Sequence, residues 1–275
     1  MSGLVRASHP EPAVAVTSVA GLLAWGVGHQ PSGVAAVAAT VLATQLAVGW
    51  ANDWLDATRD THVGRADKPL TSGDVSRRAV GAAAVLAAVA TGPIALTTNP
   101  TAALWITLAL LSALLYNWPL KFTAASVLPY AFSFGALPAF VVLALPGAPA
   151  PPVWLVAAGS LLGAGAHFAN VLPDLDDDAR TGVRGLPHRI GPAWSRLAAA
   201  TLLLAATAAL VFGPAGAPSW AGVTAIVAAA VVLPAGWYAS RASGRRGARP
   251  VAVFRAVMLV AVIDVALLVA SGRGL

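Results

Sequence analysis

Long apolar segments alternate with short polar connections along the whole chain. Windows of about 20 apolar residues are long enough to cross a bilayer as helices. Pro and Gly clusters, such as Gln30-Pro31-Ser32-Gly33 and Asn99-Pro100, separate several of them and favour helix ends. The sequence therefore predicts an all-α membrane protein with nine transmembrane helices. The expected spans are residues 13–30, 33–54, 79–97, 101–118, 124–145, 152–173, 193–213, 218–239 and 251–271.

The composition agrees with a bilayer environment. Of the 275 residues, 58% are hydrophobic and 10% are charged, whereas soluble proteins have about 25% charged residues. The length suits a single domain over residues 1–275. The absence of Cys excludes disulfides and thiolate metal sites. The first apolar segment lacks the basic start and the cleavage site of a signal peptide, so we expect it to remain as a helix.

Basic side chains concentrate in alternate connections. Because cytoplasmic loops of membrane proteins are rich in Lys and Arg, the amino terminus and the even-numbered connections are expected in the cytoplasm and the carboxyl terminus outside. A multi-pass protein of the cell membrane follows. The net charge of +6 does not indicate nucleic-acid binding, since the charges lie between apolar segments rather than on one basic face. The basic residues of these connections are Arg6, Arg59, Arg65, Lys68, Arg77, Arg78, Lys121, Arg180, Arg184, Arg189, Arg196, Arg241, Arg245, Arg246 and Arg249, with Arg273 expected on the opposite side.

The two longest of these connections follow the second and the sixth predicted helices. They are four helices apart, which indicates two four-helix halves with the ninth helix appended. Nine of the eleven acidic residues of the chain fall in these two connections.

Asparagine and aspartate residues recur with one spacing in both connections. Residues 52, 56 and 60 are spaced i, i+4 and i+8, as are residues 170, 174 and 178, so each set lies along one face of a helix. Such concentrated carboxylates repel one another unless cations join them, and hard oxygen ligands suit Mg²⁺. Two facing clusters could grip one diphosphate through bridging ions. The candidate metal ligands are Asn52, Asp53, Asp56, Asp60, Asn170, Asp174 and Asp178.

These segments resemble the motifs of the UbiA superfamily of intramembrane prenyltransferases. The first motif of that family reads Asn-Asp, two residues, Asp, three residues, Asp, and residues 52–60 fit it. Lys68 stands where the continuation of this motif commonly has Arg. The positions that carry the rest of the resemblance are Arg65, Pro69, Ser72 and Gly73 after the first motif, Tyr116, Pro119 and Lys121 after the fourth helix, and Asn170, Asp174, Asp178, Gly182, Arg184, Arg189 and Gly191 in the second motif.

The resemblance implies two Mg²⁺ ions held by the aspartate motifs and an isoprenoid tail lying among the helices, in a central cavity open to the cytoplasmic side. Asp56, Asp60, Asp174 and Asp178 are then the candidate catalytic residues, because metal ions make diphosphate a better leaving group. The candidates for diphosphate contact are Arg65, Lys68, Lys121 and Arg184, and those for the substrate pocket are Tyr116 and His167.

The predicted function is Mg²⁺-dependent transfer of a prenyl group from a prenyl diphosphate to an acceptor, most often an aromatic or quinone precursor in this family. Two other functions stay open. A terpene cyclase of the same family would use the same motifs without an acceptor. A transporter is disfavoured, because transport sites need polar groups near the middle of the bilayer, whereas the charges here lie at one face. The motifs leave the acceptor and the prenyl chain length undetermined.

Overall fold

The structure, a computed structural model, describes residues 3–65, 67–245 and 252–270, and all secondary structure among them is helical. Arg246, Arg249 and Arg273, which support the predicted topology, lie outside these residues. Three short 3-10 helices, η1 (Leu120–Phe122), η2 (Ala124–Ser126) and η3 (Leu172–Asp174), join longer elements. The α-helices are α1 (Gly3–Ala7), α2 (Pro10–Gly26), α3 (Pro31–His62), α4 (Arg77–Leu96), α5 (Pro100–Asn117), α6 (Val127–Leu143), α7 (Val153–Val171), α8 (Leu175–Arg180), α9 (Leu186–Phe212), α10 (Trp220–Arg245) and α11 (Ala252–Ala270).

Seven helices of the described chain are long and apolar enough to cross a membrane, and they are α3, α4, α5, α6, α7, α9 and α10. Each of them overlaps one of the ranges expected from the apolar segments. The helices α2 and α11 also overlap such ranges, and as membrane spans they stay predictions. A helical protein with several membrane-spanning segments is therefore confirmed.

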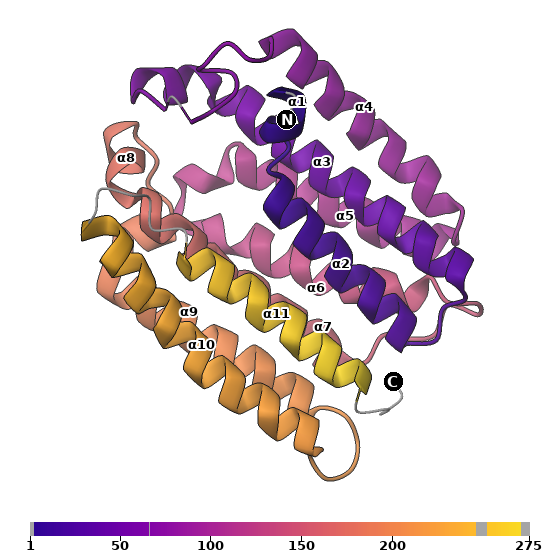
Figure 1. Cartoon of the computed structure of the whole chain (residues 1–275). Helices are drawn as coiled ribbons and strands as arrows, with labels where there is room; N and C mark the ends of the chain where they lie inside the picture. Colours follow the sequence, from indigo (N-terminus) through magenta and orange to yellow (C-terminus); the bar gives the residue numbers. More distant parts are fainter. Residues whose placement is uncertain (1–2, 66, 246–251, 271–275) are drawn as a thin grey trace.

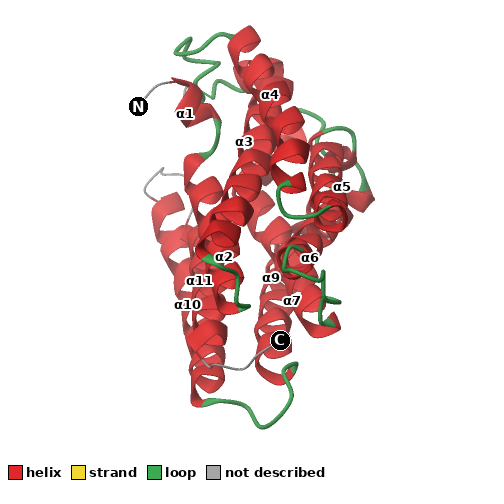
Figure 2. Ribbon diagram, turned by 90° about the vertical axis from the view of Figure 1, so that its right-hand side faces the viewer, coloured by secondary structure: helices red, strands yellow, loops and turns green. Residues whose placement is uncertain are grey.

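The long helices form a ring. Helices α2 to α7 and α9 to α11 pack against their neighbours in chain order, and α11 returns to pack against α2. Figures 1 and 2 show them running roughly alongside one another, with α1 and α8 at one end of the bundle and the α9–α10 loop at the other. This closure surrounds a central cavity with helices. The division into two four-helix halves stays a prediction.

Small residues set the distance between α6 and α7. A Cβ atom on Gly163 would lie 2.4 Å from the backbone oxygen of Tyr130, and one on Gly159 would lie 2.5 Å from that of Phe134. Small side chains allow helix backbones in membrane proteins to approach closely. The close contact brings Tyr130 of α6 beside Asn170 near the end of α7.

Two helix boundaries differ from the sequence prediction in ways that affect the aspartate segments. The helix expected to end at residue 54 continues to His62, so the whole first segment lies on one uninterrupted helix. In contrast, α7 ends at Val171, and η3 with Pro173 separates it from α8. Proline lacks a backbone N–H and clashes with the preceding turn, which explains the interruption. The second segment therefore lies on three consecutive elements.

Candidate active site

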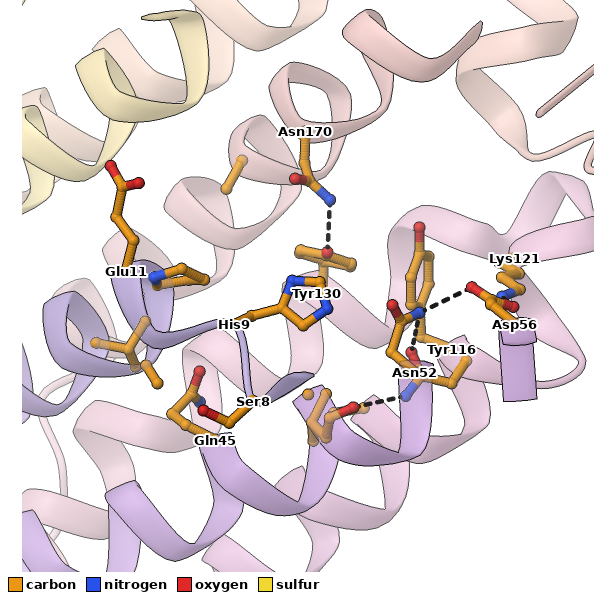
Figure 3. Close-up of a pocket in the computed structure, with 18 of the residues that line it drawn as sticks. Ser8, His9, Glu11, Gln45, Asn52, Asp56, Tyr116, Lys121, Tyr130 and Asn170 are labelled. Atoms are coloured by element: carbon orange, nitrogen blue, oxygen red, sulfur yellow. Dashed lines mark hydrogen bonds and ion pairs between the residues drawn. The ribbon is translucent and has the colours of Figure 1, made fainter. Parts of the chain in front are cut away.

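Both aspartate segments border one cavity of about 680 Å³ in the middle of the helix ring. Figure 3 shows side chains from the start of α2, from α3, α6 and α7, and from the α5–α6 connection around it. Of the sequence-predicted site residues, those that line the cavity are Asn52, Asp56, Asp60, Arg65, Lys68, Tyr116, Lys121, Asn170, Asp174 and Asp178.

Asp56 is the most connected carboxylate of the first segment. Its Oδ1 atom accepts a hydrogen bond from Lys121. Its Oδ2 atom accepts from Arg59 at 2.9 Å and from the amide of Asn52 at 3.2 Å. Because the Nδ2 group of Asn52 also donates to Asn117 at 3.4 Å, the carbonyl oxygen of Asn52 keeps its lone pairs for another partner.

The second segment reaches the same cavity from the opposite wall. The amide of Asn170 donates to the hydroxyl of Tyr130 at 3.3 Å, which again leaves its carbonyl oxygen as an acceptor. Asp174 lies 3.8 Å from a guanidinium nitrogen of Arg65. Asp178 lies 3.4 Å from Nε2 of His188.

One arginine connects the two segments. The guanidinium of Arg59 lies 2.9 Å from Asp56 and 3.5 Å from Asp178, and 3.9 Å from Asp60. The carboxylates of α3 and α8 are therefore close enough to share a single cationic group. The two motifs with matched spacing therefore lie close together in space, although they are more than 100 positions apart in the chain.

The oxygen ligands suit a Mg²⁺ ion that also binds water and substrate, rather than an ion enclosed by protein ligands alone. Among the described residues, no three acidic or histidine side chains converge on one point as they would for a fully protein-bound ion. Mg²⁺ usually keeps several waters and binds through one or two carboxylates together with substrate phosphates. Asn52, Asp56, Asp60, Asn170, Asp174 and Asp178 supply oxygen atoms of this kind on facing walls of the cavity.

Basic side chains line the same end of the cavity. Lys121 is 5% exposed, and it lies in η1, between the membrane-spanning segments. Burial lowers the pKa of Lys121 even though the charge of Asp56 acts in the opposite direction. Arg65 holds Asp67 through two hydrogen bonds of 3.0 Å and also faces Asp174. These cations are suited to contact phosphate oxygens that metal ions leave uncovered.

The profile of the UbiA prenyltransferase family matches residues 13–263. The chain belongs to this family. The resemblance seen in the two motifs is confirmed over most of the sequence, and a family with this helical architecture agrees with a multi-pass membrane protein.

Known members with related sequences cover only part of the chain. A protein from Paracidovorax citrulli named 4-hydroxybenzoate octaprenyltransferase is 40% identical over 139 residues, which are 48% of this chain and 46% of that protein. One of the same name from Polaromonas naphthalenivorans is 36% identical over 138 residues, 48% of this chain and 47% of that protein. The matches thus span about half the length of these relatives.

Solved structures of UbiA homologues share the whole fold. The apo structure of a UbiA homologue from Aeropyrum pernix K1 has a TM-score of 0.76 at 22% identity and covers 95% of this chain and 98% of the other. A UbiA homologue from Archaeoglobus fulgidus, bound to DMAPP and Mg²⁺, has a TM-score of 0.70 at 14% identity and covers 98% of both chains. At these identities the likeness establishes the fold of this family member.

Three residues that the sequence predicted at the site are not among those that line the cavity. Asp53 is buried and pairs with Lys68 and His9, which do line the cavity. Arg184 is exposed in the α8–α9 connection. His167 is buried behind the cavity wall, where Nε2 meets the hydroxyl of Ser126 at 3.0 Å and the ring packs on Tyr116.

The structure also brings residues to the cavity that the motifs did not indicate. His9 and Glu11 come from the segment around the start of α2, and Tyr130 comes from α6. Glu11 pairs with Arg255 of α11 through contacts of 2.7 and 3.1 Å. The sequence did not indicate His9 and Glu11 as site residues. Both precede the first apolar segment, so no helical periodicity showed which way their side chains point.

The cavity becomes apolar away from the aspartate segments. The side chains of its apolar walls come from α2, α3, α5, α6, α7 and α11, and they include Val16, Val48, Ile106, Ala109, Leu110, Ala113, Phe134, Leu137, Ala166 and Met258. Beyond Ile106 and Leu137, the fully buried residues Val41, Phe140 and Val141 fill the bundle. One cavity thus joins an ionic end to a hydrocarbon-lined end.

Proposed function

We propose that this UbiA family member transfers a prenyl group from a prenyl diphosphate to an aromatic or quinone-precursor acceptor, with Mg²⁺ and with release of diphosphate. The observation that carries the proposal is that Arg59 contacts Asp56 and Asp178 together. A single diphosphate between the two segments would have carboxylates of both within reach of its metal ions. The apolar half of the same cavity supplies a place for a prenyl chain.

The ionic end acts on the leaving group. Bound Mg²⁺ would neutralise the charge that develops on the bridging oxygen when the allylic C–O bond breaks. Asn52, Asp56, Asp60, Asn170, Asp174 and Asp178 are the proposed holders of these ions. Arg65, Lys68 and Lys121 are the proposed direct contacts of the diphosphate oxygens, because they line the same end of the cavity.

The walls of the cavity handle the allylic carbon. Aromatic faces attract cations, and Tyr116 and Tyr130 pack edge to face at 4.8 Å between ring centroids beside the ionic end. Their position supports a role in stabilising positive charge at the reacting carbon. The apolar residues around the prenyl chain would exclude water that would otherwise trap the cation.

The proposed orientation places the ionic end at the cytoplasmic face. Arg6, Arg59, Arg65, Lys68, Lys121 and Arg255 gather at this end of the cavity, and cytoplasmic segments are the ones rich in basic residues. In this orientation α2 and α11 complete nine spans, and the chain acts as one domain. The carboxyl terminus then lies outside.

An aromatic acid is the proposed acceptor class. Relatives named 4-hydroxybenzoate octaprenyltransferase, 36–40% identical over half of the chain, support it. An electron-rich ring can attack the allylic carbon, form the new C–C bond and lose a ring proton, while the electrons of the broken C–O bond leave with diphosphate.

The test is a product assay with the purified full chain in lipid. The protein is incubated with Mg²⁺ and geranyl or a longer prenyl diphosphate, with and without 4-hydroxybenzoate, and products are identified by mass spectrometry. A prenylated aromatic product that requires both Mg²⁺ and the acceptor is expected. Cyclic hydrocarbon or alcohol products formed at the same rate without the acceptor would overturn the transferase proposal in favour of cyclisation.

A further inference from the structure

The segment before α2 lies across the ionic end of the cavity and is fastened to the chain that surrounds it. Arg6 donates to Asp74 at 2.5 Å and to the backbone oxygen of Asp67 at 3.0 Å. The indole of Trp50 donates to the backbone oxygen of Leu4 at 2.9 Å. These contacts fix residues 3–9 against α3 and the α3–α4 connection, which also supplies the diphosphate candidates Arg65 and Lys68.

A glycine of α3 makes this contact possible. A Cβ atom on Gly49 would lie 2.5 Å from the backbone oxygen of Ser8, which is closer than side-chain carbons approach an oxygen. The backbone of the segment therefore rests directly on α3. The next residue, His9, lines the cavity, and Figure 3 shows it among the other side chains that surround the cavity.

His9 has an unusual backbone conformation for a histidine that precedes a proline. Its φ of 54° and ψ of 64° are left-handed, a region that non-glycine residues rarely adopt and that costs conformational energy. His9 precedes the first residue of α2, yet its side chain makes no capping hydrogen bond. Its side chain instead reaches Asp53, so the strained backbone serves that contact rather than the helix end.

Two polar side chains meet at Asp53 and also contact each other. Nε2 of His9 lies 2.8 Å from Oδ1 of Asp53, and Nζ of Lys68 lies 2.5 Å from the same oxygen. Nζ of Lys68 also lies 3.1 Å from Nε2 of His9. A single ring nitrogen either donates to Asp53 or accepts from Lys68, but not both at once. Because a carboxylate oxygen has two lone pairs, His9 and Lys68 can both donate to Oδ1 of Asp53 at once when Nε2 of His9 carries the proton.

Asp53 needs a permanent partner. It is 2% exposed, and its Oδ2 atom has no hydrogen-bond partner among the described residues. A buried carboxylate without a hydrogen-bonding partner is strongly unfavourable. If Lys68 were its sole partner, moving that ammonium group to a diphosphate would leave Asp53 without one. His9 supplies a donor that stays.

We propose that His9 is a positioning residue that holds Asp53 while Lys68 turns from Asp53 to the diphosphate. The inference rests on the proposed function, since it assigns His9 to the prenyl diphosphate site. It also gives Asp53 a role distinct from that of Asp56 and Asp60. Asp53 pairs with Lys68 when no diphosphate is bound, whereas Asp56 and Asp60 line the cavity themselves.

The experiment compares His9→Ala with His9→Gln in the full chain. Binding of geranyl diphosphate in the presence of Mg²⁺ is measured by calorimetry, and KM and kcat are measured with 4-hydroxybenzoate as the acceptor. We expect His9→Ala to raise Kd and KM for geranyl diphosphate about tenfold, the effect of losing one hydrogen bond to a charged group, with kcat nearly unchanged. The amide of His9→Gln donates to Asp53 and restores most of the affinity. His62→Ala, at an exposed histidine at the end of α3, is the matched control and should bind as the wild type does.

A double-mutant cycle separates positioning from a general loss of structure. In a Lys68→Ala background, His9→Ala should have little further effect on Kd, because the residue that His9 assists is already gone. An unchanged Kd for His9→Ala, or an equal loss with and without Lys68, would overturn the inference. If the wild type binds no geranyl diphosphate with Mg²⁺, the proposed function itself fails, and that result is distinct from a failure of His9 alone.

Discussion

The two aspartate segments share one spacing but differ in how the chain holds them. The first lies on the uninterrupted helix α3, where the side chains of Asp56 and Asp60 are 7% and 5% exposed. The second passes from α7 through η3 to α8, where the side chains of Asp174 and Asp178 are 37% and 16% exposed. A helix interior fixes side-chain direction, whereas a chain broken at Pro173 leaves more freedom.

This difference suggests a division of roles. The buried first segment forms a rigid platform whose carboxylates already have partners in Arg59 and Lys121. We expect the more exposed second segment to adapt its position when metal ions and diphosphate bind. Residues around the first segment should therefore affect both stability and activity, and residues around the second should affect activity alone.

Among the tests of this difference between the two segments, Asp56→Asn is expected to cause the largest loss of activity. Removing the charge while keeping the shape should lower kcat/KM for the prenyl diphosphate by about 10³-fold or more, because a proposed metal ligand is lost. The amide oxygen still accepts from Lys121, so folding is retained. Thermal unfolding in lipid checks this. Asp56→Ala leaves the buried ammonium of Lys121 unpaired, so it should lower the free energy of unfolding by about 3–5 kcal/mol more than Asp56→Asn does. Near wild-type turnover of Asp56→Asn would remove this residue from the metal site.

Asp174→Ala should separate activity from stability. We expect roughly a 100-fold loss of diphosphate release with a change in unfolding free energy within about 0.5 kcal/mol, since the side chain is partly exposed. Asp176→Ala is the matched control, because Asp176 is exposed and lies outside the cavity lining. Equal losses in the two variants would show that the local negative charge, rather than the position of Asp174, is what matters.

The smallest effects are expected for Tyr130→Phe and Asn117→Ala. These variants remove the hydrogen-bond partners of Asn170 and Asn52, the matched asparagines of the two segments. Tyr130 is the hydrogen-bond acceptor for Asn170, so its loss should raise the Mg²⁺ concentration for half-maximal activity about tenfold. Asn52 also donates to Asp56, so Asn117→Ala should raise that concentration less. The reverse order would indicate that the first asparagine is the more weakly held of the two.

Helical periodicity made much of this arrangement predictable. The apolar segments indicated where the helices lie, and the i, i+4, i+8 spacing placed Asn52, Asp56 and Asp60 on one face of α3. The same geometry did not distinguish Asp53 from these residues. Successive residues of a helix are turned by about 100°, so Asp53 lies on nearly the same side of α3 as Asp60, seven residues later, and the spacing could not show that Asp53 pairs with His9 and Lys68.

Contacts between distant segments could not be read from the sequence in the same way. Nothing in the polar spacing indicated that the segment before α2 crosses the cavity, because that position depends on Gly49 and on Arg6 reaching Asp74. The break of the second segment did have a local signal in Pro173. The path of the chain after Pro173 depends on contacts of α8 and η3 with α9, which local propensity does not determine.

The most direct test of a shared site is a titration of geranyl diphosphate binding with Mg²⁺ in four proteins: the wild type, Asp56→Asn, Asp178→Asn and the double variant. If both segments hold one metal-bound diphosphate, binding by the wild type requires Mg²⁺, each single variant loses most of it, and the double variant loses little more, because residues that act as one unit are not additive. Binding that persists without Mg²⁺, or losses that simply add in the double variant, would contradict the account.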